Sequence, residues 1–336
     1  MGITGVFFIP SNPNASTVFS AVTEKLHKSL TDEPVPVGRW ALEHKLMRDT
    51  PSCLPASASQ RPAQARYMQF LSLTYFPNHG FIYTSQPPGQ PTQQPGAGAT
   101  NPTLTPQPQQ PSAAATPAST PGSVATDRSP MVMSTVPLQS CSTLFQHFSY
   151  ACQPFWCHRH TVTVPNGIVY DVGDFRVRVG DVRQTQPAVR VRGTVVEIEW
   201  KGPSLVASVA SQYHQLRKGT GSPADGGLRD DDDDSGIDMA CADSIEETDI
   251  DTEYAATAAL IREFWARLEI EGAREAVLVT DVGKESKEQL RRMKQQGMQK
   301  PDQTFNGNGQ LAEEDPDPEA GVDVARQFME IFRFNR

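Results

Sequence analysis

The chain has 336 residues, carries a net charge of −9 at pH 7, and is 38% hydrophobic. That length allows one large domain or two medium ones, and its 28 prolines indicate a globular protein interrupted by segments that do not fold. The negative charge is local, because residues 217–252 contain 12 acidic and 3 basic side chains and the remainder sums to zero. We therefore do not expect a basic protein that binds nucleic acid directly and sequence-specifically.

Membrane insertion and export are not expected either. No run approaches ~18 consecutive apolar residues, the length that a membrane-spanning helix needs. The first ten residues lack the basic region of a secretory signal. Five cysteines are few and odd in number for a chain of this length, so we expect reduced thiols in the cytosol or nucleus rather than a disulfide framework.

Three segments are predicted to be disordered insertions within one domain. Residues 85–125 contain ten prolines and seven glutamines but no aromatic residue, residues 217–252 centre on five consecutive aspartates, and residues 284–321 are polar with glycine and proline breaks. Such segments cannot bury enough apolar surface to offset chain entropy. The parts that remain are residues 1–84, 126–216, 253–283 and 322–336. Together they hold about 220 residues, enough for a single core.

These parts are predicted to form an α+β domain whose main element is an antiparallel, β-barrel-like sheet with a few flanking helices. Helices are expected from Ser16 to Leu30, over residues 254–269, and over residues 322–336 as the C-terminal helix, because apolar residues recur there with helical spacing. Strands are expected where apolar runs or period-two alternation occur. The predicted strands are residues 2–9, 39–46, 67–76, 81–84, 131–136, 161–164, 167–170, 175–179, 189–200 and 276–280.

A metal site is the first chemistry to consider. Cys152, Cys157, His158 and His160 are residue types that bind zinc, with Cys141 and His147 nearby. Their spacing is poor, because Cys157 and His158 are adjacent and point to opposite faces of a strand. We therefore expect small core cysteines and partly exposed histidines, and we expect no metal and no cofactor.

Three pairs of charged residues have period-two spacing, which places the members of each pair on one face of a strand. The pairs are Arg176 with Arg178, Arg190 with Arg192, and Glu197 with Glu199. One interpretation places them on a polar outer face, with the alternating valines packing the core. The alternative is a metal-dependent tunnel-type triphosphatase, in which arginines would face Glu197 and Glu199 across a lumen. That enzyme needs further acidic pairs on strands, so we favour the first interpretation.

Several blocks, in order along the chain, resemble the fungal family of Mediator subunit 20. The blocks are MGITGVFFIP (1–10), GRWALEHKLMRD (38–49), QPFWCHRH (153–160), DVGDFRVRVGDVR (171–183), VRGTVVEIEW (191–200), IREFW (261–265) and RQFME (326–330). They cover nearly all of the folded parts and skip the three insertions. The resemblance implies a non-enzymatic subunit in the head module of the Mediator coactivator complex, which supports transcription by RNA polymerase II in the nucleus.

The resemblance also implies partners. Similar proteins form a heterodimer with Mediator subunit 18, which a helix of subunit 8 holds to the rest of the head. That dimer supports contacts with the polymerase and the TATA-binding protein. The family supplies no catalytic motif, so no catalytic residue is expected. Candidates for a protein interface follow from spacing and residue type. They are Phe155, Trp156, His158, Arg176, Arg178, Arg183, Arg190 and Arg192.

Overall fold

One antiparallel sheet organises the part of the chain that the computed structural model describes, which is residues 2–11, 17–55, 57–58, 65–85, 131–219, 244–298 and 317–333. Its strands are β1 (Thr4–Pro10), β2 (Val35–Asp49), β3 (Tyr67–Leu73), β4 (His79–Ser85), β5 (Met131–Pro137), β6 (Trp156–Val172), β7 (Phe175–Gln186), β8 (Arg190–Trp200) and β9 (Arg274–Ala276). The helices are α1 (Phe19–Ser29), the short 3-10 helix η1 (Thr50–Cys53), α2 (Leu138–Tyr150), α3 (Leu205–Gly219), α5 (Glu247–Arg267), α6 (Lys284–Met298) and α7 (Val322–Phe332).

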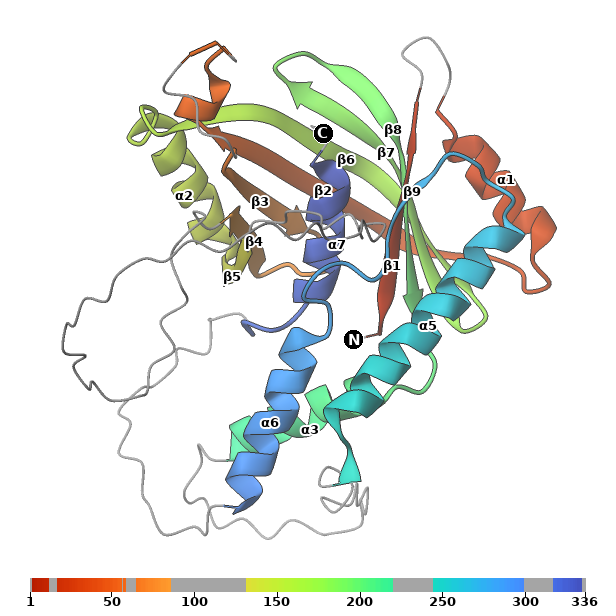
Figure 1. Cartoon of the computed structure of the whole chain (residues 1–336). Coiled ribbons are helices and arrows are strands. Elements are labelled where there is room, and N and C mark those ends of the chain that lie inside the picture. The colour runs from red at the N-terminus through yellow and green to blue at the C-terminus, as the bar shows by residue number, and fades with distance from the viewer. Residues whose placement is uncertain are drawn as a thin grey trace, which may run out of the picture.

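The sheet is strongly curved but open. Its strand order is β5-β4-β3-β2-β6-β7-β8-β1-β9, so within the described residues β5 and β9 are edge strands that do not pair with each other. Figure 1 shows the sheet bending around helix α7, and α7 contacts strands near both edges. The predicted α+β class is confirmed, while a closed barrel is not formed because α7 fills the space between the edges.

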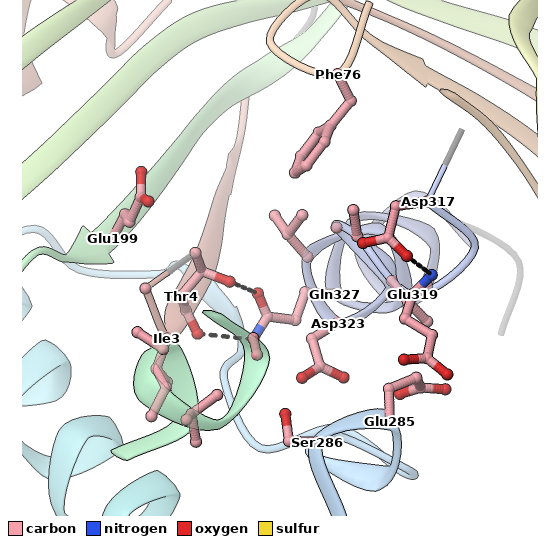
Figure 2. A pocket seen from close by; sticks show the side chains of 18 of the residues that line it. Ile3, Thr4, Phe76, Glu199, Glu285, Ser286, Asp317, Glu319, Asp323 and Gln327 are labelled. Carbon is pink, nitrogen blue, oxygen red and sulfur yellow. Dashed lines mark hydrogen bonds between the residues drawn. The ribbon is translucent and has the colours of Figure 1, made fainter. Parts of the chain in front are cut away.

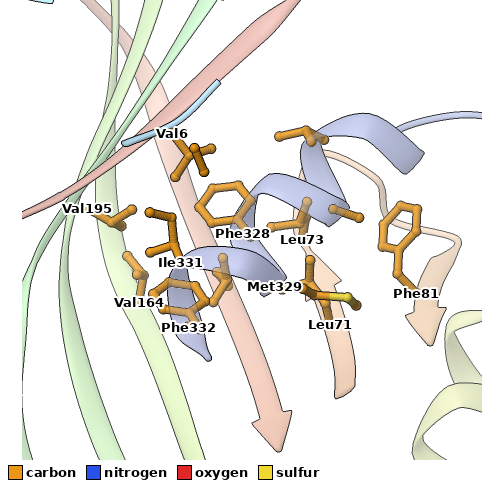
Figure 3. Packing of buried hydrophobic residues seen from close by; sticks show 14 of the residues in the cluster. Val6, Leu71, Leu73, Phe81, Val164, Val195, Phe328, Met329, Ile331 and Phe332 are labelled. Atoms are coloured by element: carbon orange, nitrogen blue, oxygen red, sulfur yellow. The ribbon is translucent and has the colours of Figure 1, made fainter. Parts of the chain in front are cut away.

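Helix α7 lies on the concave face and supplies the centre of the main core. Figure 3 shows Phe328, Met329, Ile331 and Phe332 of this helix among side chains of the surrounding strands. All four are at most 3% exposed. Gly321 precedes the helix with φ of 75°, and a Cβ there would come within 2.5 Å of the Phe76 ring. A glycine is therefore required where the chain enters this core.

The convex face is also covered, so most central strands are apolar on both sides. Along β1, Val6 and Phe8 pack toward α7, while Phe7 and Ile9 pack toward α1 and α5. The Phe7 ring stacks on Trp265 of α5 with centroids 4.3 Å apart. Helix α2 covers β3 and β4 on the same outer side, around Phe70, Met68 and Cys141. Period-two alternation thus directs alternate side chains into two separate cores.

A third apolar cluster joins α3, α5 and α6 beside the start of β1, with Val209, Ile250 and Leu290 as central members. This corrects the prediction that residues 284–321 form a disordered insertion, because residues 284–298 are helix α6. The sequence of α6 is strongly polar, and its few apolar residues, Leu290 and Met293, are buried only through contact with the other two helices.

Residues 299–316 and, apart from Ser85, the predicted insertion 85–125 lie outside the described residues. Of the predicted insertion 217–252, only residues 220–243 lie outside them. Residues 217–219 end α3, and α5 begins at Glu247 and not at the expected residue 254, so these two parts of the predicted insertion are helical.

Two further predictions about the central part need correction. The sequence patterns predict no helix within residues 126–216, but α2 and the greater part of α3 lie there. The turn expected at Pro165 and Asn166 is instead part of the continuous strand β6, where both residues are exposed and the pairing with β7 shifts register. A register shift accommodates proline because no ladder hydrogen bond is required of it there. No helix in the described part of the chain is both long and apolar enough to cross a membrane.

We predict that Phe328→Ala destabilises the protein by about 3 to 5 kcal/mol, because it leaves a cavity where the fully buried Phe328 ring packs against Trp40 and Phe332. Urea denaturation measures the loss. The matched control is Leu260→Ala on α5, where the side chain is 41% exposed, and we expect about 0.5 kcal/mol or less. Similar losses for the two variants would contradict the central position of α7.

Two histidines are buried beneath the C-terminal end of α7. His44 is fully buried, accepts or donates one hydrogen bond at 3.0 Å to Gln69, and lies 5.4 Å from the Phe332 ring by centroids. Burial lowers the pKa of His44 to about 3, with a smaller contribution from His160. Burial, together with the charge of Arg192, lowers the pKa of His160 to about 4. Both imidazoles are therefore neutral in the folded protein.

We predict that this pair makes the protein acid-sensitive. The unfolded chain takes up protons below pH ~6.5, whereas the folded chain does not until about pH 3 to 4, so stability is lost progressively as the pH falls through that window. For His44 alone the loss between pH 7 and pH 5 is about 2 kcal/mol. Urea titrations at these two pH values should show a pH dependence that is smaller by that amount in His44→Gln. The exposed His147→Gln control should keep the dependence of the unmodified protein.

Candidate functional site

Arg178 and Glu197 form a buried ion pair on the concave face of the sheet. They are direct partners in the β7–β8 register, and their side chains are 8% and 1% exposed. The valines that alternate with them pack under α1 and α5 on the convex face, so the pleat turns both charges inward. The expected polar outer face is therefore wrong for this pair, because helices cover the outer face.

Each carboxylate oxygen of Glu197 accepts a short hydrogen bond. Oε1 accepts from Nη1 of Arg178 at 2.6 Å, and Oε2 accepts from the Tyr75 hydroxyl at 2.6 Å. The guanidinium also donates through Nη2 to Oε2 of Glu199 at 2.8 Å, and it lies 4.1 Å from the centroid of the Tyr75 ring. This arrangement satisfies a buried charge with an opposite charge, a hydroxyl and an aromatic face.

Burial governs the protonation behaviour of this network. It raises the pKa of the Glu197 carboxyl, although the Arg178 charge and the Tyr75 hydroxyl oppose the shift. Burial also lowers the pKa of Arg178, but the interactions with Glu197, Tyr75 and Glu199 together outweigh it, so the net shift is upward. The pKa of Tyr75 is raised by burial and by the adjacent Glu197. Removing one partner would therefore leave an uncompensated charge in a site that excludes water.

A cavity of about 550 Å³ lies between this network and helices α3, α6 and α7. Figure 2 shows Glu199 on one side and, on the other, Glu285 and Ser286 of α6 with Asp323 of α7. Asp323 accepts a hydrogen bond from the Tyr254 hydroxyl at 2.7 Å and one from Arg326 at 3.0 Å. The acidic groups of the wall are thus already bonded to protein donors.

Gln327 ties α7 to the first strand at the same cavity. Its Oε1 accepts from the Thr4 hydroxyl at 2.7 Å, and its Nε2 donates to the backbone oxygens of Thr4 and Val277 at 2.7 and 2.8 Å. The first two of these bonds are drawn in Figure 2. A glutamine that is 1% exposed and uses both ends of its amide is a structural link.

The cavity gives no support to the triphosphatase alternative. In the described part of the chain, no group of three or more His, Cys, Asp or Glu side chains is arranged to hold a metal ion. Arg178 and Glu197 bind each other and Tyr75, and Arg176 is directed to Asp171 by hydrogen bonds at 2.9 and 3.3 Å. These charged side chains are therefore hydrogen-bonded to other groups of the protein.

The zinc candidates are separated by the fold. Cys141 is buried in the core under α2, whereas His160 lies near His44 on the concave face. His158 points to the convex side, with its ring 5.3 Å from Phe145 by centroids and 3.0 Å from the Thr161 hydroxyl. Burial lowers the pKa of His158.

Aromatic side chains are exposed around the C-terminal end of α2. Tyr150 is 81% exposed and Phe155, in the turn that follows, is 65% exposed. Trp156 starts β6 half-buried, with the Arg66 guanidinium 5.7 Å from its ring. We call Tyr150, Phe155 and Trp156 the aromatic surface. Spacing and residue type in the sequence indicate Phe155 and Trp156 as interface candidates but not Tyr150, whose exposure depends on where α2 ends.

A groove of about 560 Å³ continues from the aromatic surface across the convex face to the end of β7. Its walls include Phe145 and Tyr150 on α2, His158 on β6 and Gln186 on β7. Val189, three residues beyond Gln186 in the β7–β8 hairpin, is 84% exposed. The groove itself is lined mainly by polar side chains, among them Glu43, Lys45 and Gln146.

The arginine candidates do not form one patch. Arg183 is exposed on the convex face of β7, and Arg190 is exposed and donates to Gln184 at 3.1 Å. Arg192 is half-buried near Arg190, and burial lowers its pKa. Arg178 is buried and already bonded. Period-two spacing in the sequence placed Arg176 with Arg178, and Arg190 with Arg192, on one face of a strand. It did not show which face of the sheet the helices cover.

Comparison with known protein families identifies the relationship. Residues 1–333 match the family described as TATA-binding related factor (TRF) of subunit 20 of Mediator complex. The chain belongs to this Mediator subunit family. Comparison with curated proteins found no match. Among solved structures, the PH1819 protein from Pyrococcus horikoshii OT3 is 10% identical and aligns over 66% of this chain and 91% of its own, with a TM-score of 0.26. At that TM-score the likeness carries no argument.

The family assignment makes this chain a Mediator subunit, with a role in transcription regulation and in association with other Mediator subunits. It agrees with the resemblance drawn from the sequence blocks. Several residues that shape the cavity were not predicted, among them Tyr75, Tyr254, Asp323 and Arg326. They come from distant parts of the chain and show no local spacing signal. Only the position of α7 in the concave face brings them together.

We predict that Glu197→Gln destabilises this Mediator subunit by about 3 kcal/mol at pH 7, because it removes the charge that neutralises the buried Arg178 and leaves the shape almost unchanged. Urea denaturation measures the loss. Glu263→Gln on α5 removes an exposed ion pair to Arg267 and should lower the free energy of unfolding by about 0.5 kcal/mol or less.

A double-mutant cycle tests the coupling within the pair. Combining Glu197→Met with Arg178→Met should lower the free energy of unfolding by less than the two single changes added together, and full additivity would argue against coupling.

Proposed function

We propose that this Mediator subunit is a non-enzymatic scaffold of the head module that works in the nucleus through protein–protein contacts. The observation that carries the proposal is the aromatic surface on a member of the family. Large exposed aromatic side chains are costly in water and typical of the centres of protein interfaces. The inward-facing charges, in contrast, are bonded to one another. We therefore place the partner-binding surface on the exterior.

The proposed partner is Mediator subunit 18, in a one-to-one heterodimer. Phe155 and Tyr150 would enter the partner as anchors, and the mainly polar groove between α2 and β7 would receive a polar segment of it. His158 lies inside this groove. Interfaces of this type bury a hydrophobic centre and keep polar groups at the rim.

Exposed arginines would form part of that rim. Arg183 lies on the same face of β7 as the groove residue Thr185, and Arg190 starts β8 just beyond the hairpin. Arg192 is a secondary candidate, because it is only partly exposed. Arg176 lines the concave cavity with Arg178 and does not belong to this rim. Arg178 is withdrawn as a contact residue, since it is buried. The helix of Mediator subunit 8, RNA polymerase II and the TATA-binding protein would be reached through the assembled heterodimer.

We predict that Phe155→Ala weakens the pairing with subunit 18 by at least ~30-fold in Kd, the effect of removing an interface anchor. The two subunits are co-expressed and purified by size exclusion, and Kd is measured by isothermal titration calorimetry. Since Phe155 is 65% exposed, its replacement should leave the melting temperature nearly unchanged. A loss of pairing therefore reports on the interface and not on folding.

Leu278→Ala is the matched control, because Leu278 is also a large exposed apolar residue, at 48%, but lies beyond β9. It should bind subunit 18 within about twofold of the unmodified protein. Equal binding by Phe155→Ala would place the interface elsewhere. Failure of the unmodified chain to pair with subunit 18 would overturn the proposed partnership.

A further inference from the structure

Two cysteines far apart in the sequence meet at one corner of the sheet. The sulfur atoms of Cys53, in η1, and Cys157, at the start of β6, are 3.3 Å apart although 104 positions separate them in the chain. Both are free thiols and both are half-buried, so small reagents can reach them. A disulfide bond is about 2.05 Å long, and closing one here requires the sulfurs to approach by only about 1.3 Å.

The chain on the Cys53 side is held by Asp49. This carboxylate is 1% exposed, accepts from the Ser52 hydroxyl at 2.7 Å through Oδ2, and accepts from the backbone N–H of Arg66 at 2.8 Å through Oδ1. The N–H of Leu54 donates to the oxygen of Pro51 and closes the short helix. Cys53 is therefore placed by a bonded turn.

Thr50 holds the two sides of the corner together. Its backbone N–H donates to the oxygen of Phe155 at 2.9 Å, and its hydroxyl donates to the oxygen of Gln153 at 3.1 Å. The same hydroxyl lies 3.5 Å from the sulfur of Cys157. The backbone that carries each sulfur is thus fixed against the other before any bond forms between them.

We propose that Cys53 and Cys157 are a redox-sensitive pair that forms an intramolecular disulfide when it meets a small disulfide oxidant such as oxidised glutathione. In a reducing compartment the two residues remain thiols, and an oxidising change converts them. The product is a covalent link between η1 and the start of β6. That link would tie η1 to the strand that begins directly after the turn bearing Phe155.

The reaction proceeds by two exchanges. The Cys157 thiolate attacks one sulfur of oxidised glutathione, whose S–S bond breaks and releases one glutathione thiolate. The Cys53 sulfur then loses its proton to solvent and attacks the Cys157 sulfur, which breaks the mixed disulfide and releases the second glutathione thiolate. Two protein thiols are oxidised, one glutathione disulfide is reduced, and the two protons end on the glutathione thiolates. Burial raises the pKa of the Cys53 thiol, which lowers its thiolate fraction and disfavours Cys53 as the first attacker.

The test treats the full-length protein with excess oxidised glutathione, quenches it with acid, and maps its chymotryptic peptides without reduction by mass spectrometry. We expect a peptide pair joined through Cys53 and Cys157, and its loss on treatment with dithiothreitol. The linked protein should melt about 5 °C higher than the reduced protein, because the cross-link restricts a long loop of the unfolded chain. Finding both cysteines free, or each separately bound to glutathione, would overturn the proposal.

Serine variants separate this pair from the other thiols. Cys157→Ser should lose the linked peptide and the rise in melting temperature, and Cys53 should instead carry glutathione. Cys152→Ser changes a half-buried cysteine in the turn before β6 and should keep both. A link between Cys152 and Cys157 in the unmodified protein would overturn the assignment. Each variant is compared in its reduced form with the reduced unmodified protein, so that a folding defect is recognised separately.

Discussion

The burial of α7 against the concave face is the constraint on which the rest of this structure depends. A sheet with apolar residues on both faces cannot leave either face in water, because exposing that area costs about 25 cal/mol for each Å². Helices α1, α2 and α5 cover the convex side, and α7 covers the concave side. The helix comes from the end of the chain, so the fold is completed only when its last described element docks. Gln327 fixes the position of that helix through three bonds to β1 and to the segment after β9.

The charges inside the curve follow from the same constraint. Period-two spacing gives each strand two faces, and once helices cover the convex face the alternate residues of β7 and β8 must face α7. Arg178 and Glu197 therefore become buried, and each is bonded to opposite or polar partners. Such a pair contributes little net stability compared with an apolar core, but breaking it is costly. The polar residues on the concave face are of the types found in active sites. Their hydrogen-bonding groups, however, are directed to one another.

The exterior carries exposed aromatic residues and two neighbouring thiols at one corner of the sheet, near the end of α2. Around the end of α2, the aromatic surface, the groove that runs to β7, and the Cys53–Cys157 pair lie on neighbouring segments. The turn that exposes Phe155 is held by Thr50 from η1. Partner contacts through Phe155 and a disulfide between Cys53 and Cys157 would therefore both act on the short segment where the turn leads into β6. The opposite end, where α3 and α6 pack on α5, is joined by apolar contacts and ion pairs such as Arg291 with Glu247.

The sequence by itself determined the α+β class, most of the strands, the C-terminal helix and the family, because apolar periodicity and ordered blocks of residues are local properties. It also identified Phe155 and Trp156 as surface candidates. Only the tertiary structure decided that the sheet stays open around α7, that α6 is a helix, that Arg178 and Glu197 face inward, and that Cys53 meets Cys157. Local spacing fixes which residues share a face, but which face is covered, and which distant residues meet there, depends on how elements from separate parts of the chain pack together.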